Sequence, residues 1–190
     1  MAKVKEKETV KKTDNKKTTN RSRLAIGAVV LAIAALWMLY NMRSSDEERV
    51  NGAVRWASFN DGMATARAEH KMVMVDVYTD WCVWCKKLDK EVYPDPRVSS
   101  AIASQFVPIK VNAESGSTIE FNGVRMTEEQ FARQAGVTGY PTVLFLDDQG
   151  KVVTTLPGFL PADRFVRVLQ YVSEHRYREQ SLDDFLSRNS

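Results

Sequence analysis

The stretch MVMVDVYTDWCVWCK, residues 72–86, decides the fold, because it predicts a buried strand that turns through a short loop into a helix. Its first half is apolar and rich in β-branched residues, which is typical of a strand that is covered on both faces. Asp76 is the one charged residue of that half. Apolar residues then recur at helical spacing from Cys85 to Val92, so a helix is expected to begin near Cys82.

The chain contains two cysteines, and they form a Cys-x-x-Cys motif at the start of that helix. Two intervening residues allow the sulfur atoms to bridge within one helical turn. Backbone N–H groups and the helix dipole favour negative charge at Cys82, so we expect its pKa to fall below the free value of about 8.5 and its thiolate to be the attacking nucleophile. Cys85 lies one turn further in, so we expect it to be more shielded and to attack a mixed disulfide formed on Cys82.

A metal centre is not expected. A structural zinc site needs four ligands at short spacing, whereas His70 and His175 stand far from the cysteines in the sequence. A purely structural disulfide is also disfavoured, because so short a loop removes little chain entropy. The redox-active pair Cys82 and Cys85 is therefore the expected reactive group, with no metal and no further cofactor.

Patterns on both sides of this stretch complete an α/β fold. Residues 113–126 are expected to form an excursion with a turn at Asn122-Gly123. The order of the other elements predicts a mixed central sheet flanked by helices. Helices are expected at Phe59–Glu69, 97–105, 127–136, 161–175 and 182–186, and strands at 72–79, 106–111, 142–146 and 151–156.

The N-terminal region has its own composition. Residues 1–23 hold nine Lys/Arg against three Asp/Glu, whereas the rest of the chain holds eighteen against twenty-one. Such a basic arm is found on proteins that bind nucleic acid or a membrane surface. The nineteen uncharged residues 24–42 decide between the two, because as a helix they span about 28 Å, close to the hydrocarbon thickness of a bilayer. We expect 1–23 to be a disordered cytoplasmic arm that contacts the lipid bilayer and no nucleic acid, and 24–42 to be a transmembrane signal-anchor helix.

The charge distribution also predicts the topology of the chain. The basic side should stay in the cytoplasm. This places a linker at 43–52, the main domain at 53–176 and a C-terminal helical tail at 177–190 on the other side of the membrane. Residues 32–34 have the small-x-small form of a cleavage site, so a cleaved signal peptide is the alternative. The domain is exported in both cases.

Two motifs, DVYTDWCVWCK at residues 76–86 and GVTGYPT at residues 136–142, resemble the thioredoxin superfamily over roughly residues 55–175. They are similar to the periplasmic C-terminal domains of bacterial Dsb-type thiol:disulfide interchange proteins. The sequence LPGFLPADRFVRVLQYV, from Leu156, also resembles periplasmic thioredoxin-related proteins. Trp84 departs from the pattern, because those domains usually carry a smaller residue there. The resemblance implies a thioredoxin-like fold in the bacterial periplasm, with the anchor as a single pass through the inner membrane.

The resemblance also implies roles for five residues. Asp76 matches the buried acid that takes the proton of the second cysteine, which agrees with the raised pKa expected for a carboxylate in an apolar strand. Lys110 matches the lysine of the neighbouring strand that pairs with this acid. Pro141 matches a cis-proline opposite the cysteines, and Tyr140 before it offers its backbone to the substrate as a strand partner. Trp81 flanks the reactive thiol and shapes the substrate-binding face.

The chain is therefore expected to be a membrane-anchored thiol–disulfide oxidoreductase. The apolar residues Val83 and Trp84 argue against a very stable thiolate, so we expect it to reduce disulfides in exported proteins with electrons from a membrane thiol carrier. Oxidation and isomerisation are alternatives, because the fold does not fix the direction of the reaction. Two other classes stay open, a client-binding module without turnover and a chaperone for a soft metal such as Cu(I).

Overall fold

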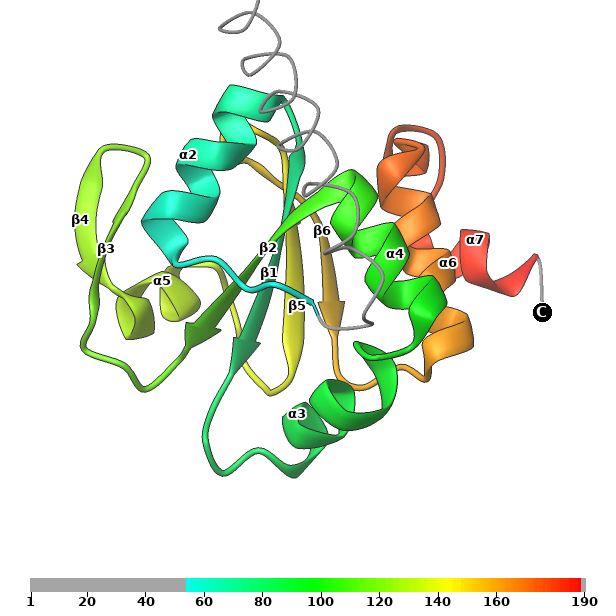
Figure 1. Ribbon diagram of the computed structural model, residues 1–190, viewed down its shortest axis with the longest axis horizontal. Helices are drawn as coiled ribbons and strands as arrows, with labels where there is room; N and C mark the ends of the chain where they lie inside the picture. The colour runs from blue at the N-terminus through cyan, green and yellow to red at the C-terminus, as the bar shows by residue number, and fades with distance from the viewer. Residues whose placement is uncertain (1–53, 189–190) are drawn as a thin grey trace, which may run out of the picture. The chain divides into compact units, whose positions relative to one another are not determined.

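The computed structural model describes residues 54–188; the arm, the transmembrane helix and the linker expected over residues 1–52 lie outside this range. A four-stranded sheet in the order β2-β1-β5-β6 forms the centre of the described residues (Figure 1). Its strands are β1 (Met72–Tyr78), β2 (Phe106–Asn112), β5 (Thr142–Leu146) and β6 (Val152–Pro157).

The sheet is mixed, as the order of elements predicts. β1 pairs with β2 in parallel and with β5 in an antiparallel manner, and β5 and β6 form an antiparallel pair. β1 is thus a central strand with both faces covered, and five of its seven residues are buried. The parallel register places Asp76 of β1 opposite Lys110 of β2.

One face of the sheet is covered by α2 (Phe59–Glu69), α5 (Glu128–Gln134) and a hairpin of β3 (Thr118–Phe121) and β4 (Val124–Thr127) (Figure 1). Alternate residues of β1 point to this side, because side chains alternate along a strand. The buried residues of this core include Val73, Val75 and Val77 of β1 together with Met63 and Phe131 of the helices.

The opposite face of the sheet is covered by a layer made of helices and helical turns (Figure 1). Its core contains Met74 of β1, Leu88, Val98, Phe165 and Leu169. Asp76 follows Met74 by two residues, so strand alternation points its side chain toward this layer. The layer is built from α3 (Val83–Lys87), the π-helical turn η1 (Leu88–Val92), α4 (Pro96–Gln105), α6 (Ala162–Ser173), the short turn η2 (Arg176–Arg178) and α7 (Leu182–Ser187).

Local signals place most element ends close to their expected positions. Ser58 caps α2, and Thr127 forms a capping box with Gln130 at the start of α5. Pro96 lies in the first turn of α4, where its missing N–H group leaves no helical hydrogen bond unmade. The interpretation of residues 113–126 as an excursion was incomplete, because Thr118–Phe121 and Val124–Thr127 pair as strands around the Asn122-Gly123 turn.

None of the helices formed by residues 54–188 has the length and apolar character needed to cross a bilayer.

Candidate active site

The loop after β1 places Cys82 at the beginning of α3. The backbone N–H of Cys82 donates to the carbonyl oxygen of Thr79 at 3.2 Å, which closes the loop. Cys82 is the N-cap of α3, and its Sγ accepts a hydrogen bond from the backbone N–H of Cys85 at 3.1 Å. This sulfur therefore lies where unpaired N–H groups and the helix dipole favour negative charge.

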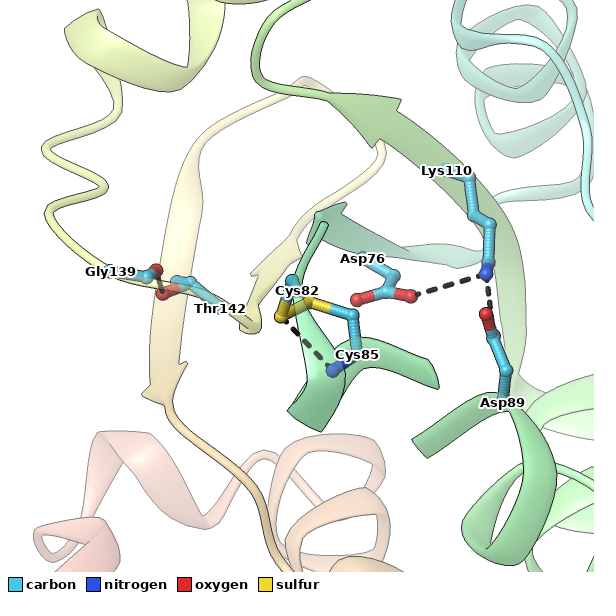
Figure 2. Close-up of a disulfide and its surroundings, with 7 residues drawn as sticks. All are labelled: Asp76, Cys82, Cys85, Asp89, Lys110, Gly139 and Thr142. Carbon is cyan, nitrogen blue, oxygen red and sulfur yellow. Dashed lines mark hydrogen bonds and ion pairs between the residues drawn. A yellow bond between two sulfur atoms is a disulfide. The ribbon is translucent and has the colours of Figure 1, made fainter. Parts of the chain in front are cut away.

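Cys82 and Cys85 form a disulfide, with their Cα atoms 5.3 Å apart (Figure 2). The side chains are 4% and 3% exposed. The expected difference in shielding is therefore absent from this disulfide form. A partner must bring its own sulfur into a nearly closed surface to reach Cys82. The lowered pKa of the Cys82 thiol stays a prediction for the reduced form.

Asp76 is the buried acid of this region and is 1% exposed. Within residues 54–188, neither of its carboxylate oxygens accepts a hydrogen bond. The pKa of Asp76 is raised from 3.8 to about 7 as the net result of several causes. Burial is the largest cause and raises this pKa, the nearby charge of Lys110 lowers it, and the charge of Asp89 raises it. The carboxyl group can therefore gain or lose a proton near neutral pH, as a general base for a thiol requires.

Lys110 is held between two carboxylates (Figure 2). Its Nζ lies 3.7 Å from Oδ2 of Asp76 and 2.5 Å from Oδ1 of Asp89. The ammonium group also lies over the rings of Trp56 and Tyr78, at 5.0 and 5.1 Å from their centroids. These contacts keep a positive charge beside Asp76, so Lys110 is not a solvent-facing lysine.

Sequence reasoning missed Asp89, which belongs to η1. A signal for it was present, because Asp89 follows Cys85 by four residues and so falls on the same helical face. Tyr93 was missed as well. Its hydroxyl is buried, and its pKa is raised well above the usual value, first by burial and then by the charges of Asp76 and Asp89.

The loop before β5 supplies the opposite wall of the site. The peptide bond between Tyr140 and Pro141 is cis, as the resemblance implied. Thr142 Oγ1 donates a hydrogen bond to the carbonyl oxygen of Gly139 at 2.7 Å (Figure 2), and the backbone N–H of Gly158 donates to the carbonyl oxygen of Pro141 at 2.8 Å. The loop is therefore tied both to itself and to the segment that follows β6.

Two exposed tryptophans stand next to the cysteines in the chain, Trp81 directly before Cys82 and Trp84 directly before Cys85. Trp81 is 63% exposed and Trp84 is 53% exposed. Trp81 contacts Tyr140 edge to face, with ring centroids 5.9 Å apart, and Trp84 packs on Phe159 at 5.4 Å. Exposure of this extent favours a contact surface over core packing for both tryptophans.

The site contains no assembled metal centre within residues 54–188, where no group of three or more His, Cys, Asp or Glu side chains is placed to hold an ion. The chemistry that the described residues can perform is acid–base and sulfur exchange chemistry. It would use a disulfide at a helix N-terminus, a buried carboxyl group and a fixed cation.

Comparisons with known proteins agree with this geometry. A family model described as a thioredoxin-like domain matches residues 59–173. A protein of Pseudoalteromonas atlantica named thiol:disulfide interchange protein DsbD is 36% identical over 110 residues, which are 56% of this chain and 17% of that protein. The chain therefore spans about one sixth of the length of such relatives.

Solved structures show the same fold. A thioredoxin from Thermus thermophilus superposes with a TM-score of 0.53 and 28% identity, over 63% of this chain and 87% of that one. A putative disulphide isomerase from Bacteroides thetaiotaomicron gives a TM-score of 0.52 and 28% identity, over 68% of this chain and 96% of that one.

Proposed function

Since the chain belongs to the thioredoxin-like domain family, we propose that it is a membrane-anchored thiol–disulfide oxidoreductase that reduces disulfides in exported proteins. One observation carries this proposal: the Cys82–Cys85 disulfide at the N-terminus of α3 lies in the same site as a buried acid, Asp76, whose pKa is about 7. The name of the DsbD relatives, thiol:disulfide interchange protein, supports the class of reaction.

The first step is attack by the thiolate of Cys82 on one sulfur of a client disulfide. A bond forms between Cys82 Sγ and that sulfur, the client S–S bond breaks, and the other client sulfur leaves as a thiolate that takes a proton from solvent. The N–H of Cys85, which points at Cys82 Sγ across 3.1 Å, stabilises the attacking charge. The product is a mixed disulfide on Cys82.

The second step is attack by Cys85 on Cys82 Sγ. Asp76 takes the proton of the Cys85 thiol, and the Cys82–Cys85 bond forms as the bond between Cys82 Sγ and the client sulfur breaks. This second client sulfur leaves as a thiolate that takes a proton from solvent. Two electrons pass from the dithiol to the client. A reduced membrane thiol carrier then returns two electrons and two protons to the Cys82–Cys85 disulfide, which restores the dithiol.

The reductive direction is proposed from the residues between the cysteines. Val83 is 73% exposed and Trp84 is 53% exposed. The side chain of Val83 has no hydrogen-bond donor, that of Trp84 has only its indole N–H, and neither carries a charge that would stabilise a thiolate on Cys82. A less stabilised thiolate makes the dithiol a better reductant.

The membrane anchor is proposed from the sequence of residues 24–42 and from the basic arm before it. In this arrangement residues 1–23 lie in the cytoplasm and the described domain lies in the periplasm of a bacterium. Protease added to intact spheroplasts should then digest the domain and leave a membrane-bound N-terminal fragment. A domain that is cut only after the cells are lysed would contradict this topology.

Insulin reduction by the full chain, with dithiothreitol as the electron source, tests the proposed reaction. We expect activity from the native chain and none from Cys82→Ser. A redox titration should return a potential well below about −120 mV, the value of a dedicated periplasmic oxidant. Activity that survives Cys82→Ser would contradict catalysis by this pair, and a potential near −120 mV would contradict the reductive direction.

A further inference from the structure

The surface around the disulfide holds an unusual share of the exposed apolar side chains. Trp81, Val83 and Trp84 are three of the five large hydrophobic residues that are exposed among residues 54–188. The disulfide between them is almost fully buried. A partner that reaches the sulfur atoms must therefore cover these side chains, which makes the aromatic residues part of any binding surface.

A negatively charged side chain, Glu114, lies beside the first aromatic pair, which is formed by Trp81 and Tyr140. The indole Nε1–H of Trp81 donates a hydrogen bond to Oε1 of Glu114 at 2.9 Å. Glu114 is exposed, and its backbone N–H is held by Oδ1 of Asn112 at 2.9 Å. The carboxylate of Glu114 is therefore fixed against the edge of an exposed tryptophan that stands directly before Cys82.

Further acidic residues accompany Glu114. Oε2 of Glu128 accepts a hydrogen bond at 3.1 Å from the backbone N–H of Asn112, the same residue whose Oδ1 holds the backbone N–H of Glu114. Asp80 directly precedes Trp81 in the sequence. The region around the first aromatic pair is thus negatively charged by more than one residue.

A positively charged side chain, Lys87, lies over the second aromatic pair, which is formed by Trp84 and Phe159. The Nζ of Lys87 lies 5.3 Å from the ring centroid of Trp84 and 5.0 Å from that of Phe159. Glu91 is 3.8 Å from this Nζ, beyond hydrogen-bonding distance, and both side chains are well exposed, so this ion pair is weak. The ammonium group can therefore accept another carboxylate.

The two aromatic pairs belong to one surface. The hydrogen bond from Gly158 N–H to the Pro141 carbonyl oxygen joins the loop that carries Tyr140 to the loop that carries Phe159. Trp81 and Trp84 in turn flank Cys82 along the chain. A polypeptide that crosses the disulfide therefore meets an aromatic pair with a carboxylate on one side and an aromatic pair with an ammonium group on the other.

We propose that the pairs Trp81–Tyr140 and Trp84–Phe159 form two subsites of opposite charge, which select extended client segments with a basic side chain on one side of the cysteine and an acidic side chain on the other. This inference rests on the proposed function and names its substrate class. A lysine or arginine of the client stacks on the first pair and meets Glu114. An aspartate or glutamate of the client meets Lys87 above the second pair.

Two peptides of identical composition test the inference. One carries lysine before and glutamate after its central cysteine, and the other carries them in reverse order. In each peptide the cysteine is capped as a mixed disulfide with 2-mercaptoethanol. Reduction by the full chain releases the peptide thiol and 2-mercaptoethanol and leaves Cys82 and Cys85 as a disulfide. We expect one order to react roughly three- to tenfold faster, and the difference to shrink at high salt.

The charge-swapped variant Glu114→Lys with Lys87→Glu should reverse this preference. The matched control, Glu120→Lys with Lys151→Glu, has the same net charge and changes two exposed residues outside the site, so it should keep the native preference. Equal rates for the two peptides, or a preference that survives the swap at Glu114 and Lys87, would overturn the inference.

Hydroxyethyl disulfide, which is small and uncharged, separates this inference from the proposed function. If the native chain reduces it but does not distinguish the two peptides, only the charged subsites are refuted. If the native chain fails to reduce it, the proposed function fails, and the substrate class fails with it.

Discussion

Lys110 and Asp76 occupy paired positions on β2 and β1, and their charged groups lie 3.7 Å apart. Asp89 binds the same ammonium group from η1. One cation therefore serves two carboxylates, of which Asp76 is buried and Asp89 is exposed. The protonation of Asp76 near neutral pH depends on how this cation is shared.

Removal of the cation should raise the pKa of Asp76. In Lys110→Met the buried carboxyl loses the charge that lowers its pKa, so this pKa should move above about 7. The midpoint of the pH profile for resolution of the mixed disulfide by Cys85 should rise by roughly one pH unit. Stopped-flow kinetics from pH 5 to 9 measure it, with Lys151→Met as an exposed control. A midpoint shared by both variants would refute the role of Lys110.

Removal of the exposed carboxylate should have the opposite effect. The charge of Asp89 raises the pKa of Asp76, and Asp89 also competes for Lys110. In Asp89→Asn the ammonium group of Lys110 no longer binds a second carboxylate and can pair with Asp76 alone. The midpoint of the pH profile for resolution of the mixed disulfide should therefore move to lower pH. An upward shift in this variant would show that Asp89 does not act through Lys110.

Loss of the buried acid should slow one step more than the other. Asp76→Asn leaves the Cys85 thiol without a base, so we expect resolution of the mixed disulfide to slow roughly a hundredfold at pH 7. Formation of the mixed disulfide by Cys82 should change much less. Single-turnover measurements of the two steps decide this. Equal slowing of both steps would indicate a general disturbance of the site instead of a missing base.

The residues at the centre of the site could be identified from sequence, because they stand out in local patterns. A charged residue in an apolar strand identified Asp76, and the Cys-x-x-Cys spacing at a helix start identified Cys82 and Cys85. The partners of these residues come from other elements. Glu114 and Phe159 reach the site through loops after β2 and β6, and no spacing rule connects such loops to α3.

The strands of the hairpin at residues 118–127 could not be predicted from local patterns either. Its strands are four residues long, and each contains exposed polar positions, so a buried-strand pattern is absent. The Asn122-Gly123 turn was the available signal, and both residues have positive φ, at 52° and 77°. Pairing of the strands depends on contact of Ile119 and Met126 with the core below.

The raised pKa of Asp76 also predicts how stability depends on pH. Between pH 3.8 and about 7 the folded chain keeps a proton on Asp76 that the unfolded chain has lost. In this range the folded state binds more protons than the unfolded state. The contribution of Asp76 to the free energy of unfolding therefore falls as the pH rises and stays low above pH 7. Ionisation of the buried carboxyl thus costs up to about 4 kcal/mol.

Asp76→Asn should remove this contribution, because asparagine does not ionise. Relative to the native chain, the oxidised variant should become more stable between pH 4 and 8, by up to about 4 kcal/mol. Urea denaturation of both oxidised chains at several pH values measures the difference. Unfolding free energies that run parallel for the two chains across this range would show that Asp76 titrates normally.

The proposed mechanism depends most on the different roles of the two sulfur atoms, with Cys82 attacking the client and Cys85 resolving the mixed disulfide. Mass spectrometry of the trapped mixed disulfide tests it directly, with Cys85→Ser and Cys82→Ser chains incubated with the same disulfide-bonded client. We predict a one-to-one adduct through Cys82 that persists in Cys85→Ser and is absent from Cys82→Ser. An adduct through Cys85 in Cys82→Ser, formed as fast and in the same yield, would contradict Cys82 as the attacking residue.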